Sequence, residues 1–187
     1  MYKRQFLFWV PVDRQISDTL SIQDKVRSIS KFVDRSMNID ELRNKNIGVV
    51  LCSSFFGFFA HTGFISALEN LGIKPIAYAG TSAGALISAF AAAGMNSTEM
   101  EEHLLQLRRA DFWDPDYLGL VRSLPSGLNS WSGLLKGDLF RDKITSLLPV
   151  DNFESCPKRC CIVSINLSKN TPEIFRHGSL IDAVCAS

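Results

Sequence analysis

The sequence predicts an α/β fold built on a mainly parallel sheet, and three observations lead to this prediction. Short apolar runs alternate with helical patterns along the chain, as they do where strands and helices alternate. The run at 47–51 is continuously apolar, which is typical of a central parallel strand buried on both faces. Hydrophobic residues make up 46% of the 187 residues and charged residues 21%, so the chain can bury the core of one domain.

Composition and charge exclude several classes of protein. Twenty basic and nineteen acidic side chains give a formal charge of +1, without the basic excess of a nucleic-acid binder. Five cysteines form an odd count without the spacing of a disulfide framework, which indicates reduced thiols and a cytoplasmic protein. The apolar stretch Phe6–Val12 is short and no cleavage site follows it, so we expect neither an export signal nor a membrane-spanning segment.

Residues 1–45 are predicted to form an N-terminal extension to a domain that occupies residues 46–187. The first five, Met-Tyr-Lys-Arg-Gln, look like the translation of a transposon end, and we expect them to lie outside the fold. The stretch 21–35 predicts an amphipathic helix with apolar positions at helical spacing, namely Ile22, Val26, Ile29 and Val33. Its basic positions suit either a solvated face or peripheral contact with an anionic membrane.

The first half of the domain is predicted to hold two strand–helix units and a third helix. In chain order the expected elements are a strand at 47–51, a turn at 52–57, a helix that Gly72 closes, a strand at 76–79, a small-residue helix that Gly94 ends, and a helix from Thr98 to about Arg109. One face of the first helix is made of Phe59, Gly63, Ala67 and Leu71. The third helix is expected to be capped by Thr98 with Glu101.

The second half is predicted to begin with a loop at 111–131, where proline and glycine recur. The expected elements after it are a helix at 139–148 and strands at 161–167 and 172–175. Ser179 and Asp182 form a helix-start pattern. Because five residues follow Asp182, we expect this helix to have nothing to pack against and the reading frame to be truncated.

The segment Gly80-x-Ser82-x-Gly84 is the strongest functional signal. An apolar strand precedes it and a helix follows at once, which is the context of a nucleophile elbow. Such a turn lifts the Ser82 hydroxyl clear of the sheet, while the glycines let the backbone pack closely. The helix N-terminus places positive partial charge under a developing oxyanion. The structural alternative is a tight turn without catalytic function.

Three histidines are candidate bases for this serine. In α/β-hydrolases the histidine comes late in the chain, after the acid, and only His177 has that position. A surface loop is the structural alternative for His177. We expect His61 to orient the turn after the first strand or to pack, and His103 to be solvated on a charged helix.

Residues 47–93 resemble the patatin-like phospholipases. The resemblance rests on Ile-Gly-Val-Val-Leu at 47–51, on Ala-His-Thr-Gly-Phe at 60–64, and on the Gly-Thr-Ser-Ala-Gly core at 80–84. Trp-Ser-Gly-Leu-Leu-Lys-Gly at 131–137 and the stretch 180–187 look like later segments of the same family.

The resemblance implies a three-layer α/β/α fold, incomplete at its C-terminal side, and a serine acyl hydrolase with a Ser–Asp dyad. Ser82 would be the nucleophile, between the elbow glycines Gly80 and Gly84. The oxyanion site would be formed by backbone around Ser53, Ser54, Gly57 and Ala83. The implied partner is a lipid or another acyl ester, met peripherally at a membrane, and no metal or organic cofactor is implied.

Two departures from the family pattern matter. The oxyanion loop of the family is Gly-Gly-Gly-x-x-Gly, whereas residues 52–57 are Cys-Ser-Ser-Phe-Phe-Gly, so a loop position that needs positive φ would be strained. The family's aspartate lies in an Asp-Gly motif, and this sequence contains no Asp-Gly dipeptide. We therefore expect the chain to lack the dyad acid and to be inactive by itself. Two alternatives stay open: an inactive lipid-binding domain, and a Ser-His-Asp hydrolase that uses His177.

Three further groups have structural alternatives. The cysteines at 156, 160 and 161 are predicted to be structural, because no second cluster completes a zinc site. The run Phe55–Phe59 suits either an acyl-chain pocket or the packing of a helix start. Phe112, Trp113 and Tyr117 have two interpretations: part of a lid or membrane-touching surface, or ordinary loop packing.

Overall fold

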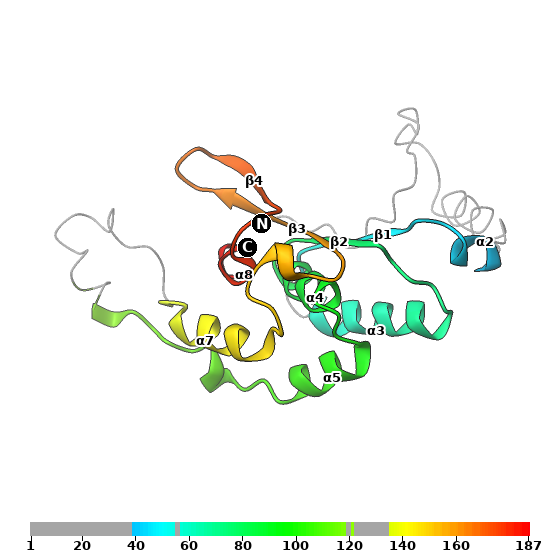
Figure 1. Cartoon of the computed structure of the whole chain (residues 1–187). Helices are drawn as coiled ribbons and strands as arrows, with labels where there is room; N and C mark the ends of the chain where they lie inside the picture. The colour runs from blue at the N-terminus through cyan, green and yellow to red at the C-terminus, as the bar shows by residue number, and fades with distance from the viewer. Residues whose placement is uncertain (1–38, 55–56, 119–120, 122–134) are drawn as a thin grey trace, which may run out of the picture.

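Four strands form one sheet in a computed structural model that describes residues 39–54, 57–118, 121 and 135–187. The strands are β1 (Gly48–Leu51), β2 (Ala77–Gly80), β3 (Arg159–Asn166) and β4 (Thr171–Phe175), in the spatial order β1-β2-β3-β4. The first three are parallel and β4 is antiparallel to β3. The predicted α/β class with a mainly parallel sheet is therefore confirmed (Figure 1). The predicted helix at 21–35, Phe55, Phe56 and most of the segment 131–137 lie outside the described residues.

The helices from residue 57 onward lie on one side of this sheet (Figure 1). The helices of the described residues are α2 (Ile39–Arg43), α3 (Gly57–Asn70), α4 (Ala83–Ala92), α5 (Ser97–Leu105), α7 (Asp138–Leu147) and α8 (Leu180–Ala186), with 3-10 turns η1 (Arg109–Asp111) and η3 (Phe153–Ser155). Helix α4 packs directly on the strands, and α3 and α5 pack beside it. Of the three predicted layers, the described residues supply the sheet and one helical layer.

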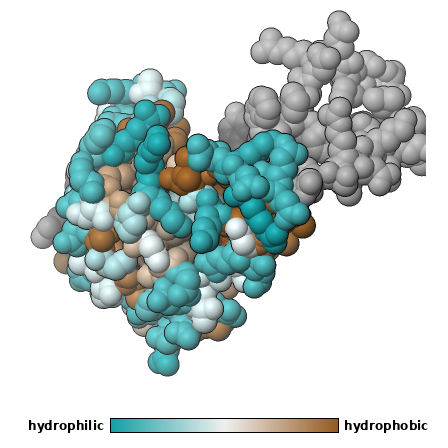
Figure 2. Space-filling model, turned by 45° about the vertical axis from the view of Figure 1, so that its right-hand side comes forward, coloured by the Kyte–Doolittle hydropathy of each residue, from teal (hydrophilic) through white to brown (hydrophobic). Residues whose placement is uncertain are grey.

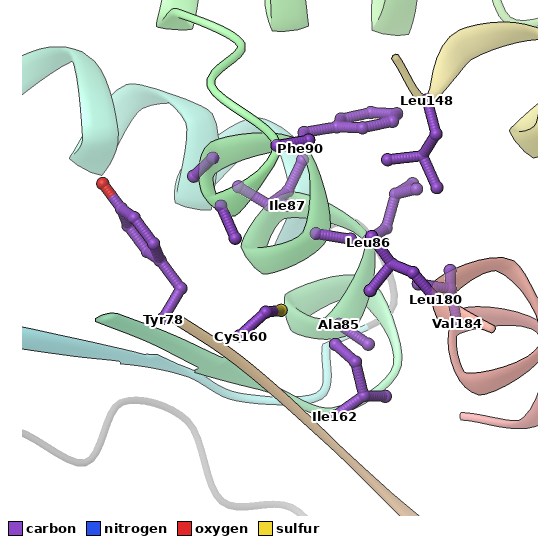
Figure 3. Close-up of a cluster of buried hydrophobic side chains, with 14 of the residues drawn as sticks. Tyr78, Ala85, Leu86, Ile87, Phe90, Leu148, Cys160, Ile162, Leu180 and Val184 are labelled. Carbon is purple, nitrogen blue, oxygen red and sulfur yellow. The ribbon is translucent and has the colours of Figure 1, made fainter. Parts of the chain in front are cut away.

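The core lies between α4 and the sheet. Every residue of α4 from Gly84 to Ala92 is buried, because small side chains let this helix approach the strands closely. Figure 3 shows Ile162 of β3 beneath Ala85, and Leu180 and Val184 of α8 beside Leu86. Burial raises the pKa of the Cys160 thiol to about 12, as expected of a structural cysteine.

The prediction that residues 47–51 form a central strand buried on both faces is wrong for the described part of the chain. There β1 lies at the edge of the sheet. Val49 and Leu51 point toward the helices and are buried, whereas Val50 points the other way and is 78% exposed. Alternate side chains of a strand face opposite sides, so a continuous apolar run does not reveal that only one side is covered. Figure 2 shows apolar surface exposed between hydrophilic residues on one side of the molecule.

Helix α3 was predicted correctly as a helix, and Gly72 follows it with φ of +68°. The face at Phe59, Gly63, Ala67 and Leu71 is nevertheless exposed, and the buried side carries His61, Thr62 and Ile65. Both polar residues are satisfied inside the protein; the Thr62 hydroxyl, for example, donates to Phe58 O at 2.9 Å. Hydrogen bonding within the protein removes the main penalty for burying polar side chains.

Helix α5 begins one residue earlier than its predicted cap. Asn96 is the N-cap residue: its side chain accepts from Glu99 N at 2.9 Å, and the Glu99 carboxylate accepts from Asn96 N at 2.8 Å. The predicted pair Thr98 and Glu101 therefore lies inside the helix. Both patterns have the same three-residue spacing, so the spacing did not select between them.

Helix α8 starts as predicted, with the Ser179 hydroxyl accepting from Asp182 N at 3.0 Å. The expectation that it has nothing to pack against is wrong. Leu180 is fully buried and Val184 is 4% exposed, and the helix packs against α4, α7 and β3.

Candidate active site

Ser82 lies between the end of β2 and the first turn of α4, as the elbow prediction requires. It is the N-cap residue of α4, with φ of 54° and ψ of −123°. A non-glycine residue rarely adopts positive φ, and such residues cluster at functional sites. The serine is exposed, so its hydroxyl is accessible from solvent.

The two elbow glycines are required by close backbone contacts. A Cβ atom at Gly80 would lie 2.1 Å from Gly84 O, and one at Gly84 would lie 2.2 Å from Leu51 O. Both clashes are with backbone, which cannot rotate away as a side-chain end can. The glycines therefore let the first turn of α4 lie directly against the ends of β1 and β2.

Two hydrogen bonds hold the elbow in place. Thr81 N donates to Leu51 O at 3.2 Å, which ties the turn to β1. The Ser88 hydroxyl donates to Ala79 O at 2.9 Å, and Ser88 is fully buried. Sequence reasoning missed Ser88; its signal was a single hydroxyl inside an otherwise apolar helix, because a buried polar group needs a partner.

The loop after β1 lies beside the elbow. Leu51 pairs with Gly80, so Ser53 and Ser54 leave β1 at the same edge of the sheet where Ser82 leaves β2. Among the described residues, the Ser53 and Ser54 N–H groups donate no hydrogen bond. Positive φ occurs at Ser82 and Asn170 alone among the described non-glycine residues. The strain expected from the loss of glycine is therefore absent at Cys52, Ser53 and Ser54.

The first turn of α4 offers a further donor. The N–H groups of Gly84, Ala85 and Leu86 bond to the carbonyls of Thr81 and Ser82. Ala83 N–H is the remaining donor of this turn, at the positive end of the helix dipole. Ser82, Ala83 and the loop at 53–54 thus lie at one edge of the sheet.

His61 is buried and contacts the backbone of the loop after β1. It is 5% exposed, and its Nε2 lies 2.8 Å from Cys52 O. An imidazole that donates from Nε2 to this carbonyl would fix the direction of the peptide group that joins Cys52 to Ser53. The expectation that His61 orients the turn or packs agrees with this contact. Gly57 packs closely against Ser54, because a Cβ atom at residue 57 would lie 1.9 Å from the Ser54 hydroxyl oxygen.

The structure does not bring His177 to Ser82. Phe175 pairs with Ile162, and Gly80 pairs with the same residue from the other side, so His177 lies toward the amino end of β3 and Ser82 toward the carboxyl end. His177 Nδ1 instead lies 3.6 Å from Glu154 Oε1. Both line a cavity of about 750 Å³ over the open face of the strands. The geometry therefore disfavours the Ser-His-Asp alternative.

Asp182 is also engaged away from Ser82. Its carboxylate accepts a hydrogen bond from the Arg141 guanidinium. This hydrogen bond, and to a smaller extent the hydrogen bond with Ser179, holds the pKa of Asp182 below its usual range.

His103 is half-buried on α5 rather than fully solvated. Among the described residues, no cluster of three metal-ligating side chains occurs.

Ser187 also lies at this site, and no sequence pattern predicted it there. Its hydroxyl accepts from Ser82 N at 2.8 Å and donates to Val163 O at 2.7 Å. Helix α8 thus brings residue 187 to the backbone of the elbow. A cavity of about 300 Å³ opens beside this contact, lined by Thr81, Val163, Ser164, Ile165, Leu167, Ala186 and Ser187.

Comparison with known proteins identifies the family of this chain. Residues 49–187, well over half of the chain, match the sequence model described as Patatin-like phospholipase. Among solved structures, the chain is similar to the type III effector protein ExoU, with 18% identity and a TM-score of 0.49 over 76% of this chain and 40% of that one. It is also similar to VipD from Legionella pneumophila, with 14% identity and a TM-score of 0.44 over 75% of this chain and 41% of that one. The chain therefore spans about 40% of these proteins. On the family match, the chain belongs to the patatin-like phospholipase family.

Proposed function

We propose that this chain carries the nucleophile and oxyanion site of a lipid acyl-ester hydrolase. The observation that carries the proposal is the positive φ of Ser82 at the start of α4, in a chain of the phospholipase family. The Ser82 hydroxyl loses its proton to a base and attacks the ester carbonyl carbon. The tetrahedral intermediate then expels the alcohol and leaves an acyl-serine, which water hydrolyses.

Backbone N–H groups of Ser53, Ser54 and Ala83 are proposed to hold the oxyanion. An oxyanion site needs correctly aimed donors, and loss of one donor costs roughly 10²–10³ in rate. Replacement of the family's glycines removes no N–H group. This supports the catalytic alternative over an inactive lipid-binding domain.

The base is proposed to be an aspartate outside these 187 residues, as the family resemblance implies. The chain by itself is then expected to show little esterase activity, because a serine without its base retains only the contributions of binding and the oxyanion site. The measurement is hydrolysis of a short-chain chromogenic ester by the purified chain. Robust turnover that Ser82→Ala abolishes would show that a base is present, and His177→Ala would then test the triad.

The decisive experiment uses the longer protein and a serine-directed fluorophosphonate. Labelling is expected and should disappear in Ser82→Ala, while Ser146→Ala, at an exposed serine of α7, serves as the matched control. Ser53→Gly with Ser54→Gly should leave labelling similar or faster. A protein that neither labels nor hydrolyses any acyl ester, yet binds lipid vesicles, would favour the inactive lipid-binding alternative.

The protein is further proposed to be cytoplasmic and to meet its substrate as a peripheral membrane protein. None of the helices in the described residues has the length and apolar character needed to cross a bilayer. Fractionation of cells that express the tagged longer protein, with a salt wash of the membranes, tests this proposal.

A further inference from the structure

The hydroxyl of Ser187 forms a bridge between the elbow and β3. Its oxygen is 2.8 Å from Ser82 N and 2.7 Å from Val163 O. A backbone N–H group can only donate and a carbonyl can only accept, so the Ser187 oxygen accepts from Ser82 and its proton goes to Val163. The direction of both hydrogen bonds is therefore fixed by the chemistry of the three groups.

The bridge lies where β2 leaves the sheet. Gly80 is the last residue of β2 that pairs with β3, and its partner is Ile162. Beyond this pair the chain turns into the elbow, while β3 continues to Asn166. No direct hydrogen bond joins Ser82 N to Val163 O, and the Ser187 hydroxyl connects these two groups instead.

The backbone of Ser82 needs support from its surroundings. Its φ of 54° and ψ of −123° are unfavourable for a residue other than glycine, and such a conformation persists only where other contacts enforce it. The Ser82 carbonyl accepts from Ala85 N at 2.8 Å and from Leu86 N at 3.2 Å. Helix α4 thus holds the carbonyl of Ser82, and Ser187 holds its N–H group.

The position of Ser187 does not depend on its hydroxyl. Leu180 and Val184 of α8 are buried in the core. Ser187 N donates to Val184 O at 3.2 Å, and the Ser164 hydroxyl donates to Ala186 O. These contacts bring the end of α8 to β3 (Figure 1). Removal of the Ser187 hydroxyl alone should therefore leave α8 in place and remove only the bridge.

We propose that Ser187 is a positioning residue for Ser82. Its hydroxyl holds the Ser82 N–H group, and this fixes the direction in which the Ser82 hydroxyl meets the ester. The proposal rests on the proposed function, in which Ser82 is the nucleophile. It also explains why the Ser82 N–H group is not among the proposed oxyanion donors: this N–H group is already engaged by Ser187.

Hydrogen exchange of the Ser82 amide tests the bridge directly in the 187-residue chain. Ser187→Ala should accelerate this exchange about tenfold or more, because the amide loses its partner. Ser164→Ala is the matched control: it also removes a hydroxyl that holds the end of α8 to β3, but this hydroxyl bonds to Ala186 O. Exchange in the control should stay near the wild-type rate. Unchanged exchange in Ser187→Ala, or equal acceleration in both variants, would overturn the proposal.

Ser187→Thr shows whether the hydroxyl itself is required. Threonine keeps a hydroxyl, and the cavity of about 300 Å³ that Ser187 lines has room for the added methyl group. The Ser82 amide should therefore remain protected in this variant. Exchange as fast as in Ser187→Ala would overturn the proposal.

The effect on reactivity is measured in the longer protein with the fluorophosphonate. Ser187→Ala should lower the rate constant of labelling roughly ten- to a hundredfold, because a small misplacement of a reacting group has an effect of this size. In ester hydrolysis kcat should fall while KM changes little. Ser187→Thr should recover most of the rate, and Ser164→Ala should label near the wild-type rate. A threonine variant as slow as the alanine variant would contradict the role of the hydroxyl.

The two proposals fail in different ways in this experiment. Labelling that survives Ser82→Ala would refute the proposed function. Labelling that Ser82→Ala abolishes, but that Ser187→Ala leaves at the wild-type rate, would refute the role of Ser187 alone.

Discussion

At the scale of single residues, a methyl group added at Gly84 or at Gly63 should have opposite effects. Both glycines lie in helices, but a Cβ at Gly84 would lie 2.2 Å from Leu51 O, whereas one at Gly63 meets nothing within 4 Å. Gly84→Ala should lower the free energy of unfolding by about 2–3 kcal/mol through overpacking. Gly63→Ala should raise it by about 0.5–1 kcal/mol, since alanine favours helix more than glycine does. Urea unfolding of the two variants measures both changes in the free energy of unfolding. If Gly84→Ala left this free energy unchanged, the close packing of the elbow would be contradicted.

His61 provides a second residue-scale prediction. His61→Phe leaves the Cys52 carbonyl without its buried donor, which should cost about 1–3 kcal/mol in stability. In the longer protein it should also lower kcat more than it changes KM, because the proposed oxyanion donors at 53–54 would no longer be held in the direction of the ester oxygen. His61→Gln can still donate to the carbonyl and should restore part of kcat. Equal kinetics for Phe and Gln at this position would show that His61 acts only by filling space.

At the scale of elements, two substitutions distinguish the observed N-cap of α5, Asn96, from the cap that the sequence pattern predicted, Thr98. Asn96→Ala should destabilise the chain by about 1 kcal/mol, because it removes one half of a reciprocal capping box. Thr98→Ala, at the residue that the sequence pattern favoured, should change stability by less than about 0.5 kcal/mol, as is usual for an exposed position. Thermal unfolding of the two variants compares them directly, and the reverse order would assign the cap to Thr98.

Element positions could be predicted from the sequence because they depend on local spacing and turn residues. The elbow is the best example: an apolar run, Gly80 and a small-residue stretch together specify a strand, a turn and a helix. The buried face of α3 could not be predicted, because burial of His61 depends on the Cys52 carbonyl across the loop. The contact of Ser187 with the elbow joins residues 105 positions apart, and no local pattern encodes it.

At the scale of the whole molecule, pH should affect stability from both ends of the range. Hydrogen bonds and ion pairs lower the pKa values of Asp114, Glu154 and Asp182 in the folded state. Such groups stabilise the fold above their unfolded pKa, and this stabilisation is lost as the pH falls below about 4. Burial raises the pKa of Cys160 from 9.0 to about 12 and, with a smaller effect of Glu69, that of Tyr78 from 10.0 to about 12. Stability should therefore also fall as the pH rises from about 9 toward 12.

Urea unfolding at pH 3, 7 and 10 measures this profile. Asp182→Asn should reduce the loss of stability between pH 7 and pH 3 without changing the loss between pH 7 and pH 10. It removes one of the three carboxyl groups but neither Cys160 nor Tyr78. A free energy of unfolding that is the same at all three pH values would contradict the assigned shifts.

The parallel order of β1, β2 and β3 explains why the candidate site forms where it does. Parallel strands present their carboxyl ends at one edge, so the loops that follow them meet there. The loop after β1, the elbow and the end of α8 all reach this edge, although they come from widely separated parts of the chain.

The positive φ of Ser82 also has an evolutionary consequence. Glycine would adopt this backbone conformation without strain, whereas serine bears a cost of about 1–3 kcal/mol. If only folding were under selection, glycine would be favoured at this position. Serine should persist only where its hydroxyl is needed. Among natural variants of the gene, retention of serine would indicate purifying selection for the proposed reaction, and glycine would identify lineages that kept the fold without that reaction.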